Sequence, residues 1–417
     1  MLKLYSTSLP LKSITKKYEL KLKKAHKILN ASKAKAFLGL PKQDAKEITK
    51  QTTSLLKKFE DIVIVGMGGS ILGSQMLFKT LKPRFYNFLN DTIKKKSTRI
   101  HFIDTLDPHL LLSYGDILNK KHTLFIFISK SGDTLETSSL FELINKGATK
   151  WFGKNFREHL LIMTENKEGH LYKEAIKNRL HIIPLPKNIG GRYSVLTEAG
   201  LIPATFMNID IKNLLKGAQN TSQVDTLAAT IYHMYKAKDK KTLVFFPYVS
   251  GLEYFNKWAI QLIAESLGKN QKTGPLPVSL LGPSDQHSVL QLLLDGPKDK
   301  WVIFFELEKY NYDYKIANNS SDNSSKNLKK EPSHSISFSQ ILKAEKIGTS
   351  KAMDQKKVPN ITISLESLKE ESVGQLIQTF LEAVAIAGIM LDINPFNQPA
   401  VELGKKQTTA LIKRQTK

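Results

Sequence analysis

The sequence DIVIVGMGGSILG, Asp61 to Gly73, decides the fold class of this chain. It begins with a continuous apolar run, passes through a turn that contains Gly66, Gly68 and Gly69, and ends at the start of an amphipathic segment. A strand without polar alternation is typical of a parallel sheet that is covered on both faces. The stretch therefore predicts a buried strand, a glycine-rich turn and a helix.

The same alternation of apolar runs and amphipathic segments continues toward the C-terminus. The further predicted strands are residues 99–105, 122–129, 159–165, 180–186, 241–249, 276–282, 300–308 and 360–366. The predicted helices are residues 70–82, 106–118, 134–148, 168–179, 211–236, 251–268, 284–295, 335–345 and 370–391. Strands that alternate with helices indicate an α/β protein with mostly parallel sheets.

We expect two three-layer αβα domains, preceded by a helical segment and followed by a C-terminal helix. The predicted boundaries are 1–58 for the N-terminal segment, 59–205 and 206–395 for the two domains, and 396–417 for the C-terminal helix. Residues 311–332, NYDYKIANNSSDNSSKNLKKEP, are dominated by Asn, Ser and Lys. We interpret them as a flexible surface loop of the second domain.

Composition narrows the class of protein. The chain has 417 residues, of which 41% are hydrophobic, enough for two or three domain cores. No stretch has the roughly eighteen consecutive apolar residues of a membrane span, and the first twenty residues lack the apolar core of a secretory signal. The absence of cysteine excludes disulfides and thiolate metal sites. We therefore expect a cytoplasmic protein that does not bind membranes.

Much of the formal net charge of +24 lies at the N-terminus, where residues 1–60 hold fifteen lysines and four acidic residues. Proteins that read DNA bases favour arginine, because its planar fork binds bidentately. Lysine outnumbers arginine throughout this chain. We predict a solvated helical face and no nucleic-acid partner. A patch that binds polyanions is the alternative.

Two common phosphate-binding patterns do not fit the glycine-rich turn. A dinucleotide fingerprint needs a glycine where Ile71 stands, and a Walker A loop needs lysine where Ser74 follows Gly73. Two interpretations remain. The turn is either a tight bend that requires glycine, or an anion site formed by N–H groups at a helix N-terminus.

A second strand-to-helix turn, within Phe125 to Thr137, brings together several hydroxyl groups. Ser129, Ser131 and Thr134 could bind phosphate together with the free N–H groups of the helix start. Capping of that helix by Asp133 or Thr134 is the alternative. Because open α/β sheets bind ligands at the carboxyl ends of neighbouring strands, two such turns favour a phosphate site.

Six motifs in this sequence resemble the glucose-6-phosphate isomerase family, whose domains are of the sugar-isomerase (SIS) type. VGMGGSILG and SKSGDTLET resemble its two SIS turns, and NIGGRYSVLTEAGLIP resembles its Gly-Gly-Arg-Tyr-Ser signature. AESLGKN, LGPSDQHSVLQLLLDGP and NPFNQPAVELGKK resemble its glutamate, histidine and C-terminal signatures. The six occur in the family's order across residues 63–406, so the match is specific.

The resemblance implies a set of site residues. The expected substrate contacts, which include those to the phosphate, are Gly69, Ser70, Ser129, Lys130, Ser131, Thr134, Gly191, Gln261 and Gln398. The expected catalytic residues are Glu265 as the base, Arg192 beside the reacting carbons, His287 in ring opening, and Lys405, which closes the site with Gln398.

These residue types also suit the chemistry on physical grounds. Moving a proton between C1 and C2 of a sugar needs a base such as Glu265, and the developing enediolate oxygen needs a fixed positive charge such as Arg192. Histidine can donate or accept a proton near neutral pH, as ring opening requires. Each residue alone also has an ordinary alternative: a solvated glutamate, a structural ion pair, a structural histidine, and a surface pair between Lys405 and Glu402.

The resemblance further implies the substrates and the assembly. The substrates would be glucose 6-phosphate and fructose 6-phosphate in glycolysis and gluconeogenesis, converted without cofactor or metal by a homodimer that shares His287 across its interface. Two alternatives stay open: an isomerase that also accepts mannose 6-phosphate, and a non-catalytic regulator that senses phosphosugars. Asp133, a carboxylate in the phosphate loop, and Asn397, in place of an acid, depart from the family pattern.

Overall fold

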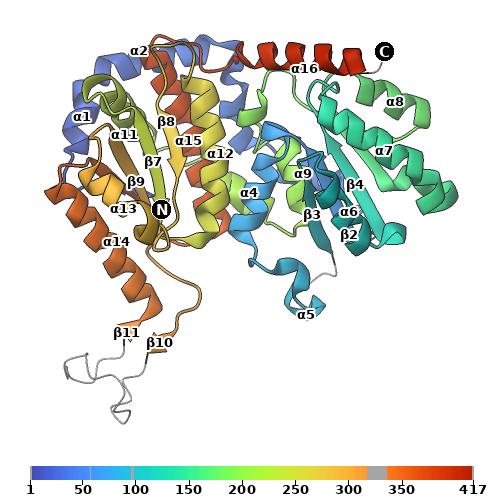
Figure 1. Ribbon diagram of the computed structural model, residues 1–417, viewed down its shortest axis with the longest axis horizontal. Coiled ribbons are helices and arrows are strands. Elements are labelled where there is room, and N and C mark those ends of the chain that lie inside the picture. The colour runs from blue at the N-terminus through green and yellow to red at the C-terminus, as the bar shows by residue number, and fades with distance from the viewer. Residues whose placement is uncertain (1, 57, 95–97, 317–335, 416–417) are drawn as a thin grey trace.

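The computed structural model describes residues 2–56, 58–94, 98–316 and 336–415. Two sheets lie side by side with helices packed between them and on their outer faces (Figure 1). This arrangement confirms the predicted α/β class with two mostly parallel sheets. Of the predicted loop at 311–332, residues 317–332 lie outside the described residues.

The first sheet is entirely parallel, with the strand order β3-β2-β4-β5-β6. Its strands are β2 (Asp61–Gly66), β3 (Arg99–Ile103), β4 (Thr123–Ile128), β5 (Leu160–Thr164) and β6 (His181–Pro184). Its helices are α4 (Leu72–Leu81), α6 (Pro108–Ile117), α7 (Leu135–Phe152), α8 (His170–Asn178) and α9 (Glu198–Phe206). The order reverses between β2 and β4, which makes their carboxyl ends the topological switch point where such sheets bind ligands.

The second sheet has the order β1-β12-β9-β7-β8, and only β1 runs antiparallel to its neighbour. Its strands are β1 (Lys3–Tyr5), β7 (Thr242–Pro247), β8 (Leu276–Ser279), β9 (Lys300–Leu307) and β12 (Asn360–Leu365). Its helices are α10 (Ile211–Ala218), α11 (Val224–Tyr232), α12 (Glu253–Leu267), α13 (Gln286–Asp295), α14 (Phe338–Gln355) and α15 (Glu370–Met390). The short strands β10 (Lys315–Ile316) and β11 (Ile336–Ser337) form a separate antiparallel ribbon.

Both faces of each sheet are buried, which explains the continuous apolar runs. In β2, Ile62 and Ile64 belong to a core cluster between the sheets, whereas Val63 and Val65 belong to a cluster beneath α7 and α8. Successive strand residues point to opposite faces, so a strand covered on both sides must be apolar at every position. The predicted strands are all present, with ends that differ by three residues at most.

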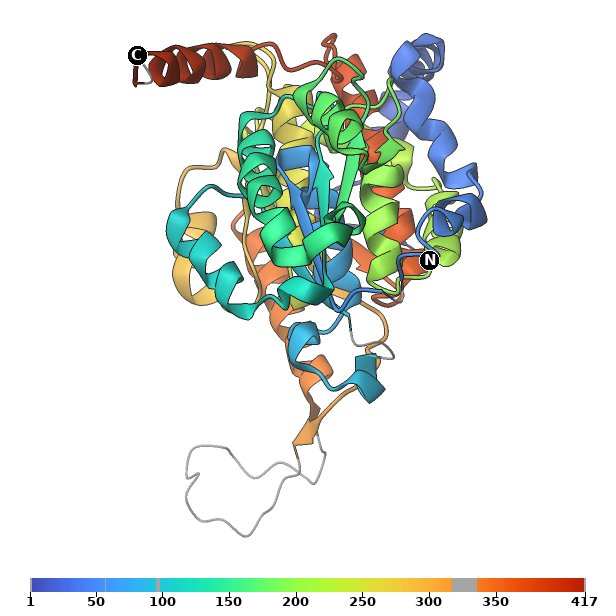
Figure 2. The same ribbon diagram turned by 90° about the vertical axis from the view of Figure 1, so that its right-hand side faces the viewer.

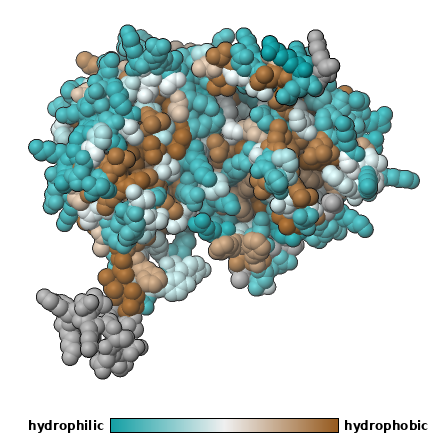
Figure 3. Space-filling view, viewed as in Figure 1, coloured by the Kyte–Doolittle hydropathy of each residue, from teal (hydrophilic) through white to brown (hydrophobic). Residues whose placement is uncertain are grey.

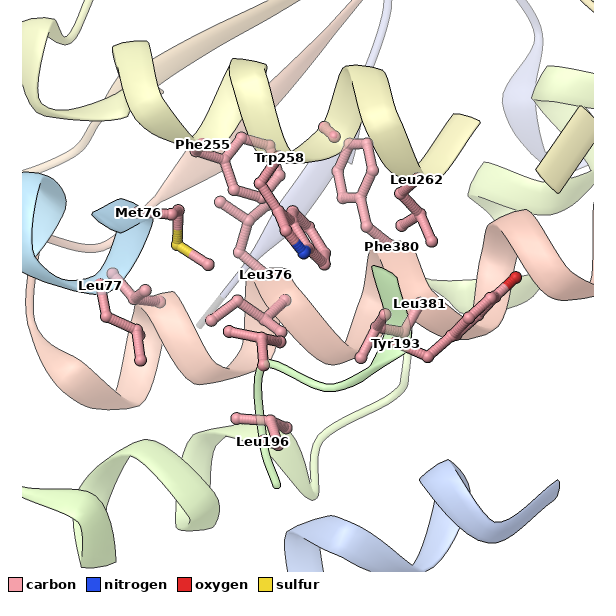
Figure 4. Close-up of a cluster of buried hydrophobic side chains, with 14 of the residues drawn as sticks. Met76, Leu77, Tyr193, Leu196, Phe255, Trp258, Leu262, Leu376, Phe380 and Leu381 are labelled. Carbon is pink, nitrogen blue, oxygen red and sulfur yellow. The ribbon is translucent and has the colours of Figure 1, made fainter. Parts of the chain in front are cut away.

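The cluster between the sheets forms one continuous core. In Figure 4, Trp258 and Phe255 of α12 meet Phe380 and Leu376 of α15, and α4 contributes Met76 from the side of the first sheet. Helices that follow strands of different sheets therefore bury their apolar faces against one another. This shared core fixes the two sheets relative to each other and holds α12 beside the carboxyl end of the first sheet.

The prediction that residues 1–58 are helical was incomplete. The segment contains α1 (Leu11–Lys17), α2 (Glu19–Ala31), a 3₁₀ stretch η1 (Lys33–Lys42) and α3 (Ala45–Lys50), but it begins with β1. This strand pairs with β12, with Leu4 opposite Ile363. A three-residue strand whose partner is so distant in the sequence has no local signal.

Two helix predictions also need correction. The single helix predicted at 211–236 is interrupted between α10 and α11, where the Asn220 side chain accepts the N–H of Ser222 and forms a turn. Helix α9 was not predicted. Nearly every one of its residues is buried and it contains Pro203, so it lacks the amphipathic period that reveals a surface helix.

Helix α15 is the one helix of the described chain that is long and apolar enough to cross a membrane. However, 89% of its apolar window is buried inside the protein. It packs against α2, α10, α11 and α12. We therefore assign α15 as the central core helix of the second sheet.

A buried ion pair holds the edge strand β1 in place. Lys346 Nζ of α14 lies 3.2 Å from Glu306 Oε2 of β9, and their side chains are 3% and 12% exposed. The Tyr5 hydroxyl of β1 donates to Glu306 Oε1 at 2.6 Å and accepts from Lys346 at 3.1 Å. Each member of this group depends on the others, because an unpaired buried charge is costly.

We predict that Glu306→Ala lowers the free energy of unfolding by about 3 kcal/mol, because it leaves the Lys346 ammonium buried without a carboxylate. The double variant Glu306→Leu, Lys346→Met should recover most of that loss in urea unfolding. The control is Glu308→Ala, which removes the exposed pair with Lys3 and should change stability little. Equal losses in the single and double variants would contradict the buried-pair argument.

Candidate active site

The two predicted turns lie next to each other at the switch point of the first sheet. Strands β2 and β4 pair with Gly66 opposite Ile128, and each continues directly into its turn. Gly68 has a φ of +52°, and a Cβ on Gly69 would lie 2.3 Å from the carbonyl carbon of Gly191. Gly69 must therefore be glycine, because the turn η2 (Gly68–Ser70) packs directly on the backbone of η6 (Gly191–Tyr193).

The hydroxyl turn after β4 is organised by its own side chains. Ser129 is buried, and its Oγ lies 2.9 Å from Thr134 Oγ1 and accepts the N–H of Gly132 at 3.2 Å. Gly132 has a φ of +72°, which allows the bend. Ser131 is exposed at the tip of the turn. This arrangement presents Ser131 and Thr134 to solvent at the N-terminus of α7.

Two charged residues of this turn point away from its tip. The Lys130 ammonium donates to the carbonyls of Lys187 at 2.6 Å and Ile189 at 2.9 Å, and burial lowers the pKa of Lys130. Asp133 Oδ1 accepts the N–H of His170, the first residue of α8, at 2.9 Å. Asp133 thus caps a helix, as the alternative interpretation held, but that helix is α8 and not α7.

Arg192 is the most highly coordinated side chain of the site, and it is only 2% exposed. Its Nε donates to Ser266 Oγ at 2.8 Å, and Nη1 donates to Glu265 Oε2 and Gln398 Oε1, both at 2.9 Å. Its Nη2 donates to the carbonyls of Pro395 at 2.6 Å and Asn397 at 3.1 Å. All five N–H groups of the guanidinium are therefore used.

Glu265 is held in place from two sides. Its Oε2 accepts the hydrogen bond from Arg192, and its Oε1 accepts one from Gln261 Nε2 at 3.0 Å. Gln261 lies one turn earlier on α12. The Glu265 side chain is 31% exposed. Lys269 donates to the carbonyls of Glu265 and Asn397. Burial, and next the charge of Arg192, lowers the pKa of Lys269 to about 8. The carboxylate is therefore fixed in orientation and still reached by solvent.

A cavity of about 510 Å³ lies between these turns. Of the residues predicted from sequence, Ser70, Lys130, Ser131, Thr134, Gly191 and Gln398 line it. Gln398 also accepts a hydrogen bond from Arg192, which donates to Glu265, so the Arg192–Glu265 pair is connected to the cavity wall. The volume lies within the range of about 300–1,000 Å³ that is usual for small-molecule sites.

Comparison with known proteins gives this geometry a context. The family model described as phosphoglucose isomerase matches residues 44–417. The chain is 34% identical to a glucose-6-phosphate isomerase of Carboxydothermus hydrogenoformans over 95% of this chain and 90% of the relative. It is 35% identical to one of Methanocaldococcus jannaschii over 86% of each. The chain belongs to the phosphoglucose isomerase family.

A solved structure shares the fold of this chain. A hypothetical protein from Thermus thermophilus superposes with a TM-score of 0.88 at 28% identity, and the match covers 99% of this chain and all of that one. The similarity therefore extends over both sheets and the terminal helices.

Seven of the thirteen residues expected from the family resemblance do not line the cavity: Gly69, Ser129, Arg192, Gln261, Glu265, His287 and Lys405. The first five belong to the turns and contacts described above, whereas the last two stand apart from them. His287 is exposed on α13, which borders the second sheet, and it is not among the residues that line the cavity. Lys405 is exposed on α16 (Val401–Gln415) and pairs with Glu402 at 2.9 Å. Helix α16 is exposed along its described length and projects beyond the body of the protein (Figure 2). One chain thus brings together Glu265 and Arg192, but neither His287 nor Lys405.

Sequence reasoning missed several residues that line the cavity of this family member. They are Lys33, Ala34 and Phe37 from η1, Glu165 after β5, Lys187, Asn188, Ile189 and Gly190 before η6, and Tyr193 and Phe396. Tyr193 and Phe396 lie within two of the quoted motifs and could have been selected. No sequence pattern marked Lys33 and Phe37 as site residues. The segment η1 reaches the cavity through tertiary packing, in which Phe37 contacts Tyr193 and Phe396.

The role of Asp133 as a helix cap can be tested. We predict that Asp133→Ala lowers the free energy of unfolding by about 1 kcal/mol, because α8 loses the acceptor for its first N–H group. The matched control is Asp133→Asn, which keeps the Oδ1 acceptor and should lose much less in urea unfolding. Equal losses in the two variants would show that the carboxylate charge, and not the cap, is what matters.

Proposed function

We propose that this chain interconverts glucose 6-phosphate and fructose 6-phosphate through a cis-enediolate after ring opening. The observation that carries the proposal is the ion pair between Arg192 and Glu265 beside a cavity that is lined by a hydroxyl turn. The full-length relatives named above are described as glucose-6-phosphate isomerases. We assign the chain as an aldose–ketose isomerase of glycolysis and gluconeogenesis that works in the cytoplasm without a cofactor.

The substrate phosphate binds at the turn after β4 in this proposal. Ser131 and Thr134 line the cavity at the N-terminus of α7, where unpaired N–H groups and the helix dipole attract an anion. Ser129 supports the phosphate site by ordering the turn, because its hydroxyl is already hydrogen-bonded to Thr134 and to the N–H of Gly132. Lys130 contributes by fixing the segment before Gly191, and its positive charge adds to the field at the turn.

Glu265 is the base that carries the proton between C1 and C2. Gln261 and Arg192 fix its two oxygens, which favours one attack geometry over the many of a free glutamate. Because every N–H of Arg192 already has an acceptor, its guanidinium stabilises the enediolate by its charge at short range. Gly69, Ser70 and Gly191 form the backbone surface against which the sugar lies.

The site is completed by a second copy of the chain. We propose a homodimer in which His287 enters the partner's cavity for ring opening, and in which Lys405 and Gln398 close over the substrate. The exposure of His287 and of the described residues of α16 supports this. The β10–β11 ribbon and the start of α14 also expose apolar side chains, Ile316, Ile336 and Phe338, and brown atoms lie at the lower left of the molecule in Figure 3.

The two alternatives receive less support. A non-catalytic phosphosugar sensor would need the phosphate turn but not the ordered Glu265–Arg192 pair. Activity toward mannose 6-phosphate depends on small contacts around C2, and we rank it second to the glucose 6-phosphate reaction. Turnover of fructose 6-phosphate and of mannose 6-phosphate is measured with one preparation treated with EDTA. Turnover distinguishes an isomerase from a sensor, and the ratio of the two rates shows which sugar is preferred.

We predict that Glu265→Gln lowers kcat for fructose 6-phosphate by about 10²–10⁴-fold, because the base is lost while the acceptors for Arg192 remain. Binding of fructose 6-phosphate should stay within severalfold, as measured by calorimetry. The control is Glu253→Gln, at the opposite end of α12, which should leave kcat unchanged. Near-normal turnover by Glu265→Gln would refute the assignment of the base.

The shared site can be tested by mixing subunits. Glu265→Ala and His287→Ala should each be inactive alone, and exchange of their subunits should restore activity. In a mixed dimer one of the two sites has both groups intact and the other has neither. No recovery, with subunit exchange confirmed by mass spectrometry, would show that each chain supplies its own ring-opening group.

A further inference from the structure

A second cavity, of about 830 Å³, lies between α3 and α10, with η1 and the end of α9 at its margins. It is larger than the sugar cavity and shares no lining residue with it. In Figure 2 the blue N-terminal helices lie along one side of the molecule. Nothing in the proposed reaction uses this space.

The rim of the second cavity is cationic. Lys46 and Lys50 stand on α3, and Lys212 and Lys216 stand on α10 opposite. Lys216 pairs with Glu371 at 3.2 Å. Within the described residues, the other three have no carboxylate within 4.0 Å. Lysines from two separate elements therefore converge on one opening, where they outnumber the acids of the lining.

The two acids at this rim do not neutralise the lysines. Asp44 Oδ1 accepts the N–H of Lys46 at 2.8 Å and caps α3. Asp210 Oδ1 accepts the N–H of Asn213 at 3.0 Å and caps α10, and its Oδ2 accepts from the Asn213 side chain at 2.8 Å. Both carboxylates keep their charge, but the lining holds four lysines against these two acids, so its formal charge is +2.

The floor of the cavity is apolar. Ile209, Ile211 and Leu215 are 6%, 4% and 3% exposed and face it together with Leu56 and Ala45. The lining contains neither arginine nor an aromatic side chain, so it lacks the groups that read and stack nucleic-acid bases. A cationic rim above an aliphatic floor complements a small molecule that has an anionic head and an aliphatic body.

We propose that this cavity is an effector site for an amphiphilic organic anion, and that its occupancy changes the affinity of the sugar cavity. The connection between the two cavities is η1. Its start, with Lys33 and Phe37, lines the sugar cavity, and Pro41 near its end lines the second cavity. One short rigid segment therefore forms part of the wall of both.

Two contacts link this segment to the active-site turn. The Phe37 ring packs on Tyr193 with 5.0 Å between ring centroids. Gln43, which follows η1 and lines the second cavity, donates to the carbonyl of Leu196 at 2.6 Å. Tyr193 and Leu196 both lie in the loop that follows Arg192. A ligand that moves α3 or η1 thus acts on the backbone that positions the guanidinium.

Calorimetric titration with octyl phosphate tests the site. The titration is made with saturating fructose 6-phosphate, so that the sugar cavity is blocked, and it is repeated with inorganic phosphate and with octanol. Octyl phosphate should bind with one site per chain, and the two half-ligands should bind much more weakly. Equal affinity for inorganic phosphate and octyl phosphate would overturn the assigned ligand class.

Charge neutralisation provides the specificity control. The site variant is Lys46→Gln, Lys50→Gln, Lys212→Gln, and the matched control is Lys154→Gln, Lys167→Gln, Lys238→Gln, all exposed lysines outside both cavities. The site variant and the control variant each lose three positive charges from a chain of formal net charge +24. The site variant should bind octyl phosphate about tenfold more weakly than the control. Equal weakening in both would show attraction to the overall charge and overturn the site.

The coupling is measured separately from binding. In the wild-type protein, saturating octyl phosphate should change KM for fructose 6-phosphate by about fivefold, and the site variant should show no change. Binding without any change in KM would overturn the effector role. Because the titration of the site variant against its control does not depend on turnover, failure of the site and failure of the isomerase assignment are distinguishable.

Discussion

The buried guanidinium of Arg192 is the interaction on which the rest of the site depends. A charge that is 2% exposed is tolerated only if its donors are all paired, and here five acceptors from two separate segments meet them. The turn after β6 supplies the arginine, α12 supplies Ser266 and Glu265, and the chain between α15 and α16 supplies the rest. These segments converge only when the core between the two sheets is formed. The hydrogen bonds around Arg192 and Glu265 therefore depend on the folded chain.

The same constraint explains the small residues around the arginine. Gly69 approaches the backbone of Gly191 so closely that no side chain fits, and Ser194 reaches across to the carbonyl of Gly69 at 3.3 Å. The turn after β2 is therefore locked to the turn that carries Arg192. Because β2 and β4 are neighbours at the switch point, the hydroxyl turn is positioned by the same sheet edge.

Charged residues near the cavity have divided roles. Lys130 and Asp133, both in the hydroxyl turn, bind backbone groups: one binds the segment before Gly190, the other the start of α8. These two side chains stabilise the turn, and the tip of the turn exposes hydroxyl and N–H groups. The N-terminal segment η1 also contributes to the site. Its residue Phe37 lines the first cavity, and its residue Pro41 lines the second.

The sequence alone determined nine of the twelve described strands, most helices and the motifs around the cavity between the two turns, because burial on both faces of a parallel sheet and tight turns leave local patterns of apolar residues and glycine. It also named Glu265 and Arg192 as candidate site residues, and the structure showed that they pair with each other. Tertiary structure decided what depends on distant partners: β1 beside β12, the entry of Lys33 and Phe37 into the cavity, and the helix that Asp133 caps. Such contacts join residues far apart in the chain, and no local period or spacing records them.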